Sequence, residues 1–313
     1  MVIRSFAALA AAMRHRPPLR VVLAGAEDAG ALAALAQGVE DGLVGAAILV
    51  GDPAAIAGSM PAALASRARI VAAHDPAATA AVRAGAADLL AKGRIDSAAY
   101  LRAILARATG IRAGDGDGDG GVLSTLTLAE MPSVPRLLGA TDTGILPLPT
   151  LAEKRAILGN ARPLFAGLGL AEVRVAAIAA SEKVSAAQPA TLDAAALAAE
   201  SRAGALPGLI VDGPFGYDVA LSPAAAAAKG LAGSPVAGRA DLILFPNLEA
   251  GNATLKAWKL HGAARTASLV IGATVPVLLN SRADGAEQRR LGLLLAQALI
   301  AGREILAAPG AGT

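Results

Sequence analysis

Residues 20–53 read RVVLAGAEDAGALAALAQGVEDGLVGAAILVGDP, and this stretch decides the fold. Val21–Gly25 is an apolar run of strand length, Ala29–Asp41 has the apolar spacing of a helix, and Ala46–Val50 is a second apolar run closed by a Gly-Asp-Pro turn. Two buried strands on either side of one helix indicate a βαβ unit, which builds a parallel sheet.

The same alternation continues to the end of the chain. Further strands are expected at Arg69–Val71, Ala87–Ala91, Val122–Leu128, Glu172–Ala180, Gly208–Val211, Asp241–Phe245 and Ser268–Gly272. Helices are expected at Met1–Arg20, Pro76–Arg83, from a Ser97 cap onward, Pro149–Asn160, Leu192–Ser201 and Ala286–Ala301. Glu153 is placed as the acidic partner in a capping box. We therefore predict an α/β fold with mainly parallel sheets.

The length of the chain predicts two domains. Its 313 residues exceed what one hydrophobic core comfortably holds, so two α/β domains with a cleft between them are expected. Ala113–Gly121, rich in glycine and aspartate, lies at the expected junction. A calcium-binding EF-hand loop would need Glu at its twelfth position, which is Leu126 when counted from Asp115. An exposed connecting loop is therefore the better interpretation.

Composition excludes several classes of protein. Hydrophobic residues make up 55% of the chain but aromatic residues only 2%, so the core is aliphatic and no basic-aromatic surface for nucleic acid is expected. No apolar run reaches the roughly 18 residues of a membrane span. Arginines on both sides of the first apolar stretch do not suit a signal peptide. A soluble, cytoplasmic protein with no membrane or nucleic-acid partner is expected.

Common catalytic motifs are also missing from the sequence. The chain has no cysteine, its three histidines lack metal-ligand spacing, and no Gly-x-Ser-x-Gly sequence occurs. The turn Ala24–Gly30 lacks the dinucleotide pattern Gly-x-Gly-x-x-Gly, and Lys92 has no upstream glycine loop of the Walker type. The sequence therefore disfavours nicotinamide and nucleoside triphosphate chemistry, and no metal site is expected.

Polar residues gather at the predicted carboxyl ends of strands, where open α/β sheets build ligand sites. They are Lys92, Arg102, Asp142, Asp212, Glu249, Asn252, Ser281 and Arg282. The planar guanidinium group of arginine pairs with two phosphate oxygens at once. We therefore expect Arg102, Ser281 and Arg282 to meet at the mouth of the interdomain cleft and to bind a phosphate or an acyl phosphate.

Several separate motifs occur in the order typical of one enzyme family. They are Ala87–Gly93, Asp96–Leu105, Thr141-Asp142, Pro149-Thr150, Val211–Pro214, Ser234–Gly238, Glu249–Asn252 and Ser281–Asp284. From about Arg20 onward the chain resembles the phosphate acetyltransferase and phosphate butyryltransferase family, and most closely its butyryltransferase branch. The resemblance implies two three-layer α/β domains of the type found in isocitrate and isopropylmalate dehydrogenases.

The resemblance also implies domain boundaries and an activity. The first domain would comprise residues 1–117 and 267–313, and the second, residues 118–266, would form most of a homodimer interface. Members of the family transfer an acyl group between coenzyme A and inorganic phosphate. Acyl-CoA and phosphate are therefore the expected partners, with coenzyme A acting as a substrate and no permanently bound cofactor.

The resemblance assigns roles to particular residues. Ser281 and Arg282 would contact the reacting phosphate and thioester, and Arg102 would be a second phosphate-binding arginine. Further substrate contacts are expected from Lys92, Gly93, Asp142, Asp212, Glu249, Gly251, Asn252 and Asp284.

The chain departs from its relatives at three positions. Gln288 stands where the acetyltransferases place a catalytic aspartate, so Glu287 is the expected base. Thr125 and Leu146 replace a family histidine and asparagine. Two alternatives remain: a non-catalytic paralogue that binds coenzyme A or acyl phosphate, and a metal-dependent oxidative decarboxylase of the same fold.

Overall fold

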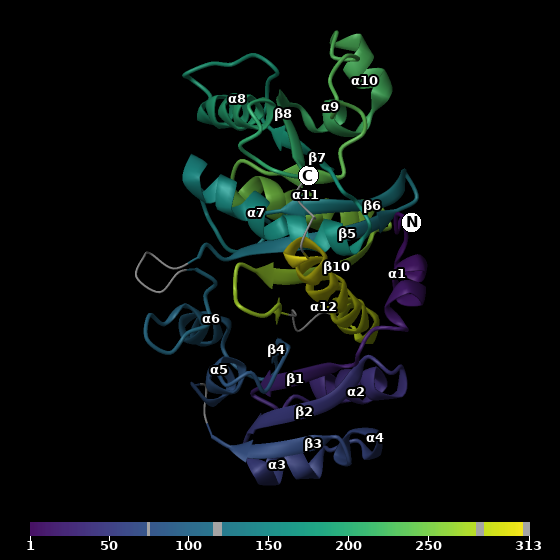
Figure 1. Cartoon of the computed structure of the whole chain (residues 1–313), viewed down its shortest axis with the longest axis vertical. Coiled ribbons are helices and arrows are strands. Elements are labelled where there is room, and N and C mark those ends of the chain that lie inside the picture. Colours follow the sequence, from purple (N-terminus) through teal and green to yellow (C-terminus); the bar gives the residue numbers. More distant parts are fainter. Residues whose placement is uncertain (74–75, 115–120, 280–284, 309–313) are drawn as a thin grey trace. The chain divides into compact units, whose positions relative to one another are not determined.

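The computed structural model describes residues 1–73, 76–114, 121–279 and 285–308, and the chain divides into two compact units (Figure 1). We call Leu9–Leu123 with Ala267–Ala298 the N-terminal unit. Met1–Ala8, Ser124–Thr266 and the residues from Leu299 onward form the central unit. The predicted first domain, residues 1–117 and 267–313, instead included both ends of the chain. That division into domains stays a prediction.

The N-terminal unit contains a mainly parallel sheet. In sheet order its strands are β3 (Ala68–Ala72), β2 (Val44–Gly51), β1 (Leu19–Ala24), β4 (Leu89–Lys92), β11 (Val277–Leu278) and β10 (Arg265–Ile271). All neighbouring strands run parallel except β10 and β11, which pair in the antiparallel sense. The expected βαβ arrangement is therefore confirmed here.

Helices connect these strands and begin at recognisable caps. They are α2 (Ala29–Glu40), α3 (Pro53–Gly58), α4 (Ala62–Ala65), α5 (Pro76–Arg83), α6 (Ser97–Leu105) and the larger part of α12 (Ala286–Ala307). Asp28, Asp52 and Asp96 each accept a backbone N–H of the first turn that follows them. The expectation that Ser97 caps α6 was wrong, because Asp96 is the cap and Ser97 is the first helical residue.

The central unit combines one antiparallel hairpin with parallel strands. In sheet order its strands are β5 (Ser124–Met131), β6 (Val134–Thr141), β9 (Leu242–Leu244), β7 (Val173–Ile178) and β8 (Leu209–Phe215). β5 and β6 are antiparallel, whereas β6, β9, β7 and β8 run parallel. Two residues between β5 and β6 leave room only for a hairpin connection.

The helices of the central unit are α7 (Leu151–Gly167), α8 (Pro189–Arg202), α9 (Tyr217–Leu221), α10 (Pro223–Ala228) and α11 (Leu248–His261). Thr150 and Glu153 form the predicted capping box at the start of α7. α7 runs past the expected end at Asn160 and contains Pro163. The short helices α9 and α10 were not expected, because five or six residues carry too little periodicity to be recognised.

The N-terminal helix is shorter than expected. α1 covers only Phe6–Met13, and its buried residues Phe6, Leu9 and Met13 lie on one face. The chain then extends into β1 at Leu19, so the helix cannot reach the predicted Arg20.

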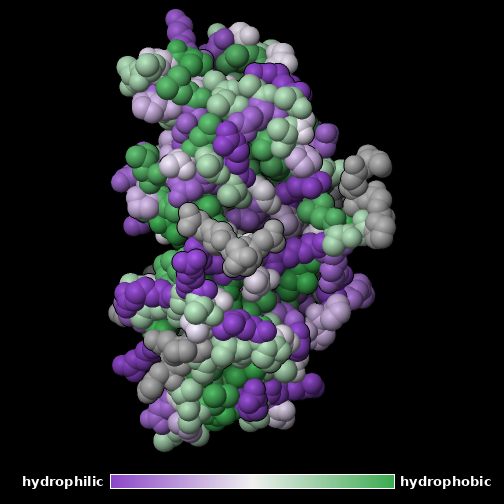
Figure 2. All heavy atoms as spheres, turned by 60° about the vertical axis from the view of Figure 1, so that its left-hand side comes forward, coloured by the Kyte–Doolittle hydropathy of each residue, from purple (hydrophilic) through white to green (hydrophobic). Residues whose placement is uncertain are grey.

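The core is aliphatic, as the composition predicted. One cluster in the central unit joins Leu138, Ile243 and Phe245 to the single tryptophan, Trp258. On the face drawn in Figure 2, hydrophilic and hydrophobic residues are interspersed. Within the described ranges, no helix combines the length and apolar character needed to cross a bilayer.

Candidate functional site

The end of β4 presents Lys92 beside a tight backbone crossing. Gly93 N donates to Ala24 O at 2.8 Å, and Arg94 N donates to Gly25 O at 2.6 Å. A Cβ on Gly93 would collide with the backbone of Gly25, so only glycine fits at this crossing. The Nζ of Lys92, which is half-buried, lies 3.4 Å from Gly93 O. The crossing therefore fixes Lys92 at the carboxyl end of β4.

Tyr100 anchors α6 to the same edge of the sheet. Its hydroxyl lies 3.3 Å from both Leu90 O on β4 and Leu278 O on β11. Burial raises the pKa of the Tyr100 phenol well above its ordinary value, so the group stays a hydrogen-bond donor at neutral pH. The phenol thus connects α6 to two neighbouring strands.

Arg102 lies on the exposed side of α6. It follows Tyr100 by two residues, a rotation of about 200° around the helix, and its side chain is exposed. The pKa of Asp96 is lowered, chiefly by the backbone N–H of Ala99, and the positive charges of Arg102 and Lys92 act in the same direction. Both cations are therefore close enough to influence one carboxylate, and the structure brings Lys92 and Arg102 to a common region.

The predicted residues Ser281, Arg282 and Asp284 lie outside the described residues. On one side of them, β11 pairs with β4, with Leu278 opposite Ala91. On the other side, α12 begins at Ala286.

The first turn of α12 gives Gln288 a structural role. Gly285 N donates to the side-chain Oε1 of Gln288 at 3.1 Å, as the third residue of a capping box does. Glu287 is exposed in the same turn. Gln288 therefore stabilises the start of the helix, and Glu287 is the first-turn carboxylate available to solvent.

Asp142 organises a loop at the carboxyl end of β6. The residue is only 2% exposed. Its Oδ1 accepts the backbone N–H groups of Thr125 at 2.8 Å and Gly144 at 3.0 Å, and its Oδ2 accepts those of Leu146 at 2.7 Å and Ile145 at 3.2 Å. Its four backbone partners make Asp142 the centre of the 144–146 loop, and its predicted contact with substrate stays a prediction.

The start of α11 packs against this loop. Asn252 Nδ2 donates to Thr143 O at 3.2 Å. A Cβ on Gly251 would collide with Asp142 O, so glycine allows the helix to approach the loop closely. Glu249 is exposed in the first turn of α11. The structure therefore brings Asp142, Gly251 and Asn252 together and leaves Glu249 beside them in solvent.

Asp212 belongs to a separate cluster on β8. Its carboxylate accepts the hydroxyl of Ser234 at 2.6 Å and the N–H of Gly213 at 3.0 Å. Ser234 Oγ in turn accepts the N–H groups of Val236 and Ala237, both at 3.1 Å. Two motifs that are distant in sequence are thus joined by one hydrogen bond. Because β9 and β7 separate β8 from β6, Asp212 is not part of the Asp142 cluster.

Sequence reasoning included Asp96, Tyr100 and Ser234 in family motifs but gave none of them a role. An acidic residue three positions before a helical N–H is a recognisable cap signal for Asp96. No local signal indicates that Tyr100 or Ser234 bonds to a distant strand. Among the described residues, no group of three His, Cys, Asp or Glu could hold a metal ion.

This fold and this site define a class of protein: an open α/β enzyme with cations and small polar groups at the ends of its strands. Residues 60–291 match the family model described as "Phosphate acetyl/butaryl transferase". The chain belongs to this family and is an acyltransferase. The family resemblance drawn from the sequence motifs is confirmed.

Individual relatives agree with the family assignment. The chain is 35% identical to a phosphate butyryltransferase of Clostridium beijerinckii over 96% of this chain and 99% of the relative. It is 36% identical to a phosphate acetyltransferase of Thermotoga maritima over 68% of this chain and 70% of the relative.

A solved structure of a branched-chain phosphotransacylase from Enterococcus faecalis V583 covers 90% of this chain and 99% of its own. Its TM-score is 0.76 at 24% identity, a likeness that concerns the fold alone. The α/β fold class is confirmed.

Proposed function

We propose that this acyltransferase moves a short-chain acyl group, such as acetyl, propionyl or butyryl, between coenzyme A and inorganic phosphate. The observation that carries the proposal is the 35% identity to a phosphate butyryltransferase along nearly the full length of both chains. Coenzyme A is then a substrate, and no permanently bound cofactor is part of the proposal. The family assignment favours this reaction over the decarboxylase alternative.

The proposed chemistry needs positive charge, a base and a donor. In one direction a phosphate oxygen attacks the thioester carbonyl carbon, an oxyanion forms, and the C–S bond breaks as the sulfur leaves and is protonated. In the other direction a base removes the thiol proton, the sulfur attacks the carbonyl carbon of the acyl phosphate, and the C–O bond breaks as inorganic phosphate leaves. Cations stabilise the phosphate, and a hydrogen-bond donor stabilises the oxyanion.

We propose the following roles for residues of this chain. Lys92 and Arg102 hold the phosphate, which is supported by the place of Lys92 at the carboxyl end of β4 and by the exposure of Arg102 on α6. Ser281 and Arg282 contact the phosphate and the thioester, which is supported by the family motif. Glu287 acts as the base, which is supported by its exposure in the first turn of α12.

The other predicted substrate contacts differ in what supports them. Gly93, Gly251 and Asn252 shape the backbone at strand ends, as their close approaches suggest. Glu249 is exposed and free to meet a ligand. Asp142 and Asp212 support loops through the hydrogen bonds described above. Asp284 remains a proposal from the family motif alone.

We also propose a cytoplasmic homodimer formed through residues 118–266. Several large apolar side chains are exposed in this segment: Leu148, Val184, Leu192 and Leu260. In the described part of the N-terminal unit, Leu105 is the comparable case. A partner chain that covered these side chains would remove their apolar surface from water. A monomeric mass in light scattering of the purified protein would contradict the dimer.

The activity is tested by following thiol release from acetyl-, propionyl- and butyryl-CoA with and without phosphate. We expect release that depends on phosphate and does not occur when sulfate replaces it. Binding of coenzyme A without turnover of any short acyl-CoA would instead favour the non-catalytic alternative.

Substitutions at the proposed phosphate site test the roles of Arg102 and Arg282. Arg102→Ala is expected to lower turnover by about 100-fold or more, the scale seen when one charge-stabilising donor is lost. Arg102→Lys should keep only part of the wild-type turnover, because lysine lacks the planar guanidinium group that pairs with two phosphate oxygens. Arg282→Ala is expected to abolish turnover. The control is Arg107→Ala, which removes an exposed arginine of the same unit, and equal rates for Arg102→Ala and Arg107→Ala would refute the role of Arg102.

A further inference from the structure

The central unit contains a cavity of about 340 Å³ at the amino end of its parallel strands. Arg136 lies near the start of β6, Arg174 near the start of β7, and Asp241 directly before β9. Because β6, β9 and β7 run parallel, this edge of the sheet is opposite the one where Asp142 follows β6. The cavity is therefore separate from the Asp142 cluster.

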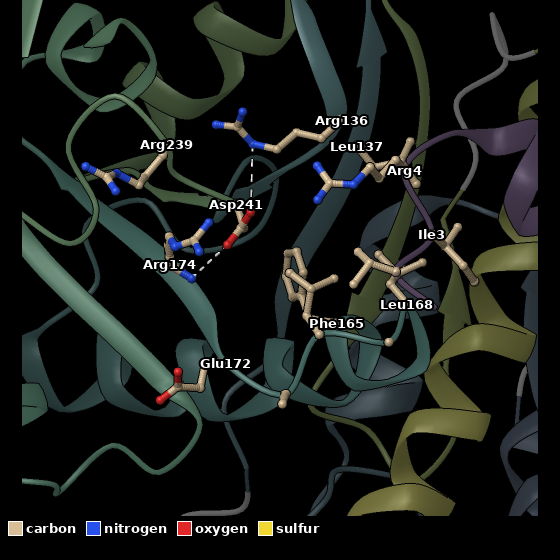
Figure 3. Close-up of a pocket in the computed structure, with 14 residues that line it drawn as sticks. Ile3, Arg4, Arg136, Leu137, Phe165, Leu168, Glu172, Arg174, Arg239 and Asp241 are labelled. Atoms are coloured by element: carbon tan, nitrogen blue, oxygen red, sulfur yellow. Dashed lines mark hydrogen bonds and ion pairs between the residues drawn. The ribbon is translucent and has the colours of Figure 1, made fainter.

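Arginines dominate the charge of this cavity. Its lining includes Arg4, Arg136, Arg174 and Arg239 against two carboxylates, Asp241 and Glu172. In Figure 3 Arg136 and Arg174 lie next to Asp241, Arg4 lies on one side of them beside Leu137, and Arg239 extends to the other side, whereas the carboxylate of Glu172 points away from the arginines. The cavity thus carries excess positive charge.

Arg136 and Asp241 already have structural roles. The guanidinium of Arg136 donates to Ala240 O at 3.0 and 2.7 Å, and its Nε lies 3.8 Å from Asp241 Oδ1. Asp241 Oδ2 accepts the backbone N–H of Arg174 at 3.0 Å. These two side chains therefore hold each other and the start of the strands in place.

The other three guanidinium groups are available to a ligand. Arg4, Arg174 and Arg239 are exposed, and within the described ranges their side chains make no hydrogen bond or ion pair. Burial lowers the pKa of Arg136. The carboxylate of Asp241 raises this pKa, whereas the like charges of Arg174 and Arg4 lower it. Arg136, Arg174 and Arg4 therefore repel one another, and an anion bound by Arg4 and Arg174 would reduce this repulsion.

The remaining wall of the cavity is apolar. Ile3, Phe165 and Leu168 are buried residues that line it, on the side of Arg4 and away from Arg174 and Arg239 in Figure 3. Small-molecule sites typically combine an apolar wall with a few placed polar groups in volumes of about 300–1,000 Å³. The cavity has both features.

We propose that this cavity binds a small organic anion, with a phosphate or carboxylate group held by Arg4, Arg174 and Arg239 and an apolar body against Ile3, Phe165 and Leu168. Guanidinium groups pair with two oxygens of either anion. The cavity is at the sheet edge opposite Asp142, and it is lined only by residues of the central unit, whereas Lys92 and Arg102 belong to the N-terminal unit. The proposed site therefore goes beyond the transfer reaction.

Calorimetric titration of the full chain tests the site with four probes: phenyl phosphate, benzoate, inorganic phosphate and benzyl alcohol. Phenyl phosphate or benzoate is expected to bind at least tenfold more tightly than inorganic phosphate or benzyl alcohol, because only they match both walls. Added salt should weaken the binding, since the arginines are exposed. Absence of binding by both phenyl phosphate and benzoate, or equal binding of inorganic phosphate, would overturn the proposal.

Variants locate the bound probe. The double substitution Arg174→Ala, Arg239→Ala should weaken binding at least tenfold. Arg69→Ala, which removes an exposed strand arginine of the N-terminal unit, should leave it unchanged. Arg102→Ala should also leave it unchanged. If Arg102→Ala abolishes binding and the double variant does not, the probe occupies the substrate site, and this proposal fails while the proposed reaction stands.

Discussion

At the scale of single residues, Asp142 shows how one buried carboxylate shapes a loop. Four backbone N–H groups of residues 125 and 144–146 point at its two oxygens. Burying a polar group without a hydrogen-bond partner costs free energy. These hydrogen bonds therefore stabilise both the buried carboxylate and the conformation of the loop. The loop conformation therefore follows from one side chain.

Asp142→Asn is expected to lower the free energy of unfolding by about 1–3 kcal/mol, the cost of an unsatisfied buried group. An asparagine amide has one oxygen, and its NH₂ group would face backbone donors. Urea unfolding followed by the fluorescence of Trp258, the single tryptophan, measures the change in the central unit.

The matched control is Asp218→Asn, at a side chain that is 58% exposed. It should change stability by no more than about 0.5 kcal/mol. If the two substitutions have the same effect, the hydrogen bonds to Asp142 do not hold the loop.

At the scale of elements, α7 and α12 approach each other at Gly302. A Cβ added there would collide with the backbone carbonyl of Pro163 and with Gly167 N on α7. Backbone atoms cannot move aside as the end of a flexible side chain can. The packing of these two helices in the central unit therefore requires a glycine at this position.

Gly302→Ala is expected to destabilise the central unit by about 1–3 kcal/mol through overpacking. Gly159 on α7 is the matched control, because its added Cβ meets nothing within 4 Å. Gly159→Ala should stabilise the unit by up to about 1 kcal/mol, since alanine is the better helix former. Thermal unfolding monitored by Trp258 fluorescence compares the two, and a stable Gly302→Ala variant would argue against the close helix contact.

At the scale of the whole molecule, surface ion pairs make stability depend on pH. The pKa of Glu182 is lowered by its hydrogen bond from Lys229, and that of Glu200 by its hydrogen bond from Arg155. Burial raises the pKa of Asp88, but hydrogen bonds from Arg20 and its charge outweigh burial and lower it overall. Both units therefore contain carboxylates that bind protons less tightly when folded.

Acid should therefore weaken the folded state. The contribution of these carboxylates is complete above their unfolded pKa values of about 4 and is lost as the pH falls through their lower folded values. Asp241 acts in the opposite direction, because burial raises its pKa and folding then favours its protonated form. Urea unfolding by circular dichroism at pH 7, 5 and 3 should show a loss of stability between the last two, and the loss should be smaller in Glu200→Gln. Constant stability down to pH 3 would contradict this account.

Local patterns were enough to predict the alternation of strands and helices, the aliphatic core, the capping box of Thr150 and Glu153, and the family. These features depend on neighbouring residues, on composition or on short motifs, so they can be read along the chain. The same reasoning placed Lys92 after a strand and Arg102 on the helix that follows, and in the structure Lys92 ends β4 and Arg102 is part of α6. Their roles in binding phosphate stay predictions.

Contacts between residues that are distant in sequence could be identified only from the tertiary structure. The sequence contains no sign that Tyr100 bonds to Leu278, that Asp212 bonds to Ser234, or that Arg4 and Arg239 line one cavity. The path of the chain brings these residues together, and side-chain type alone does not specify that path. The sequence by itself therefore determined the elements, the core and the family, whereas the partners of each polar group were decided only when the strands were placed side by side.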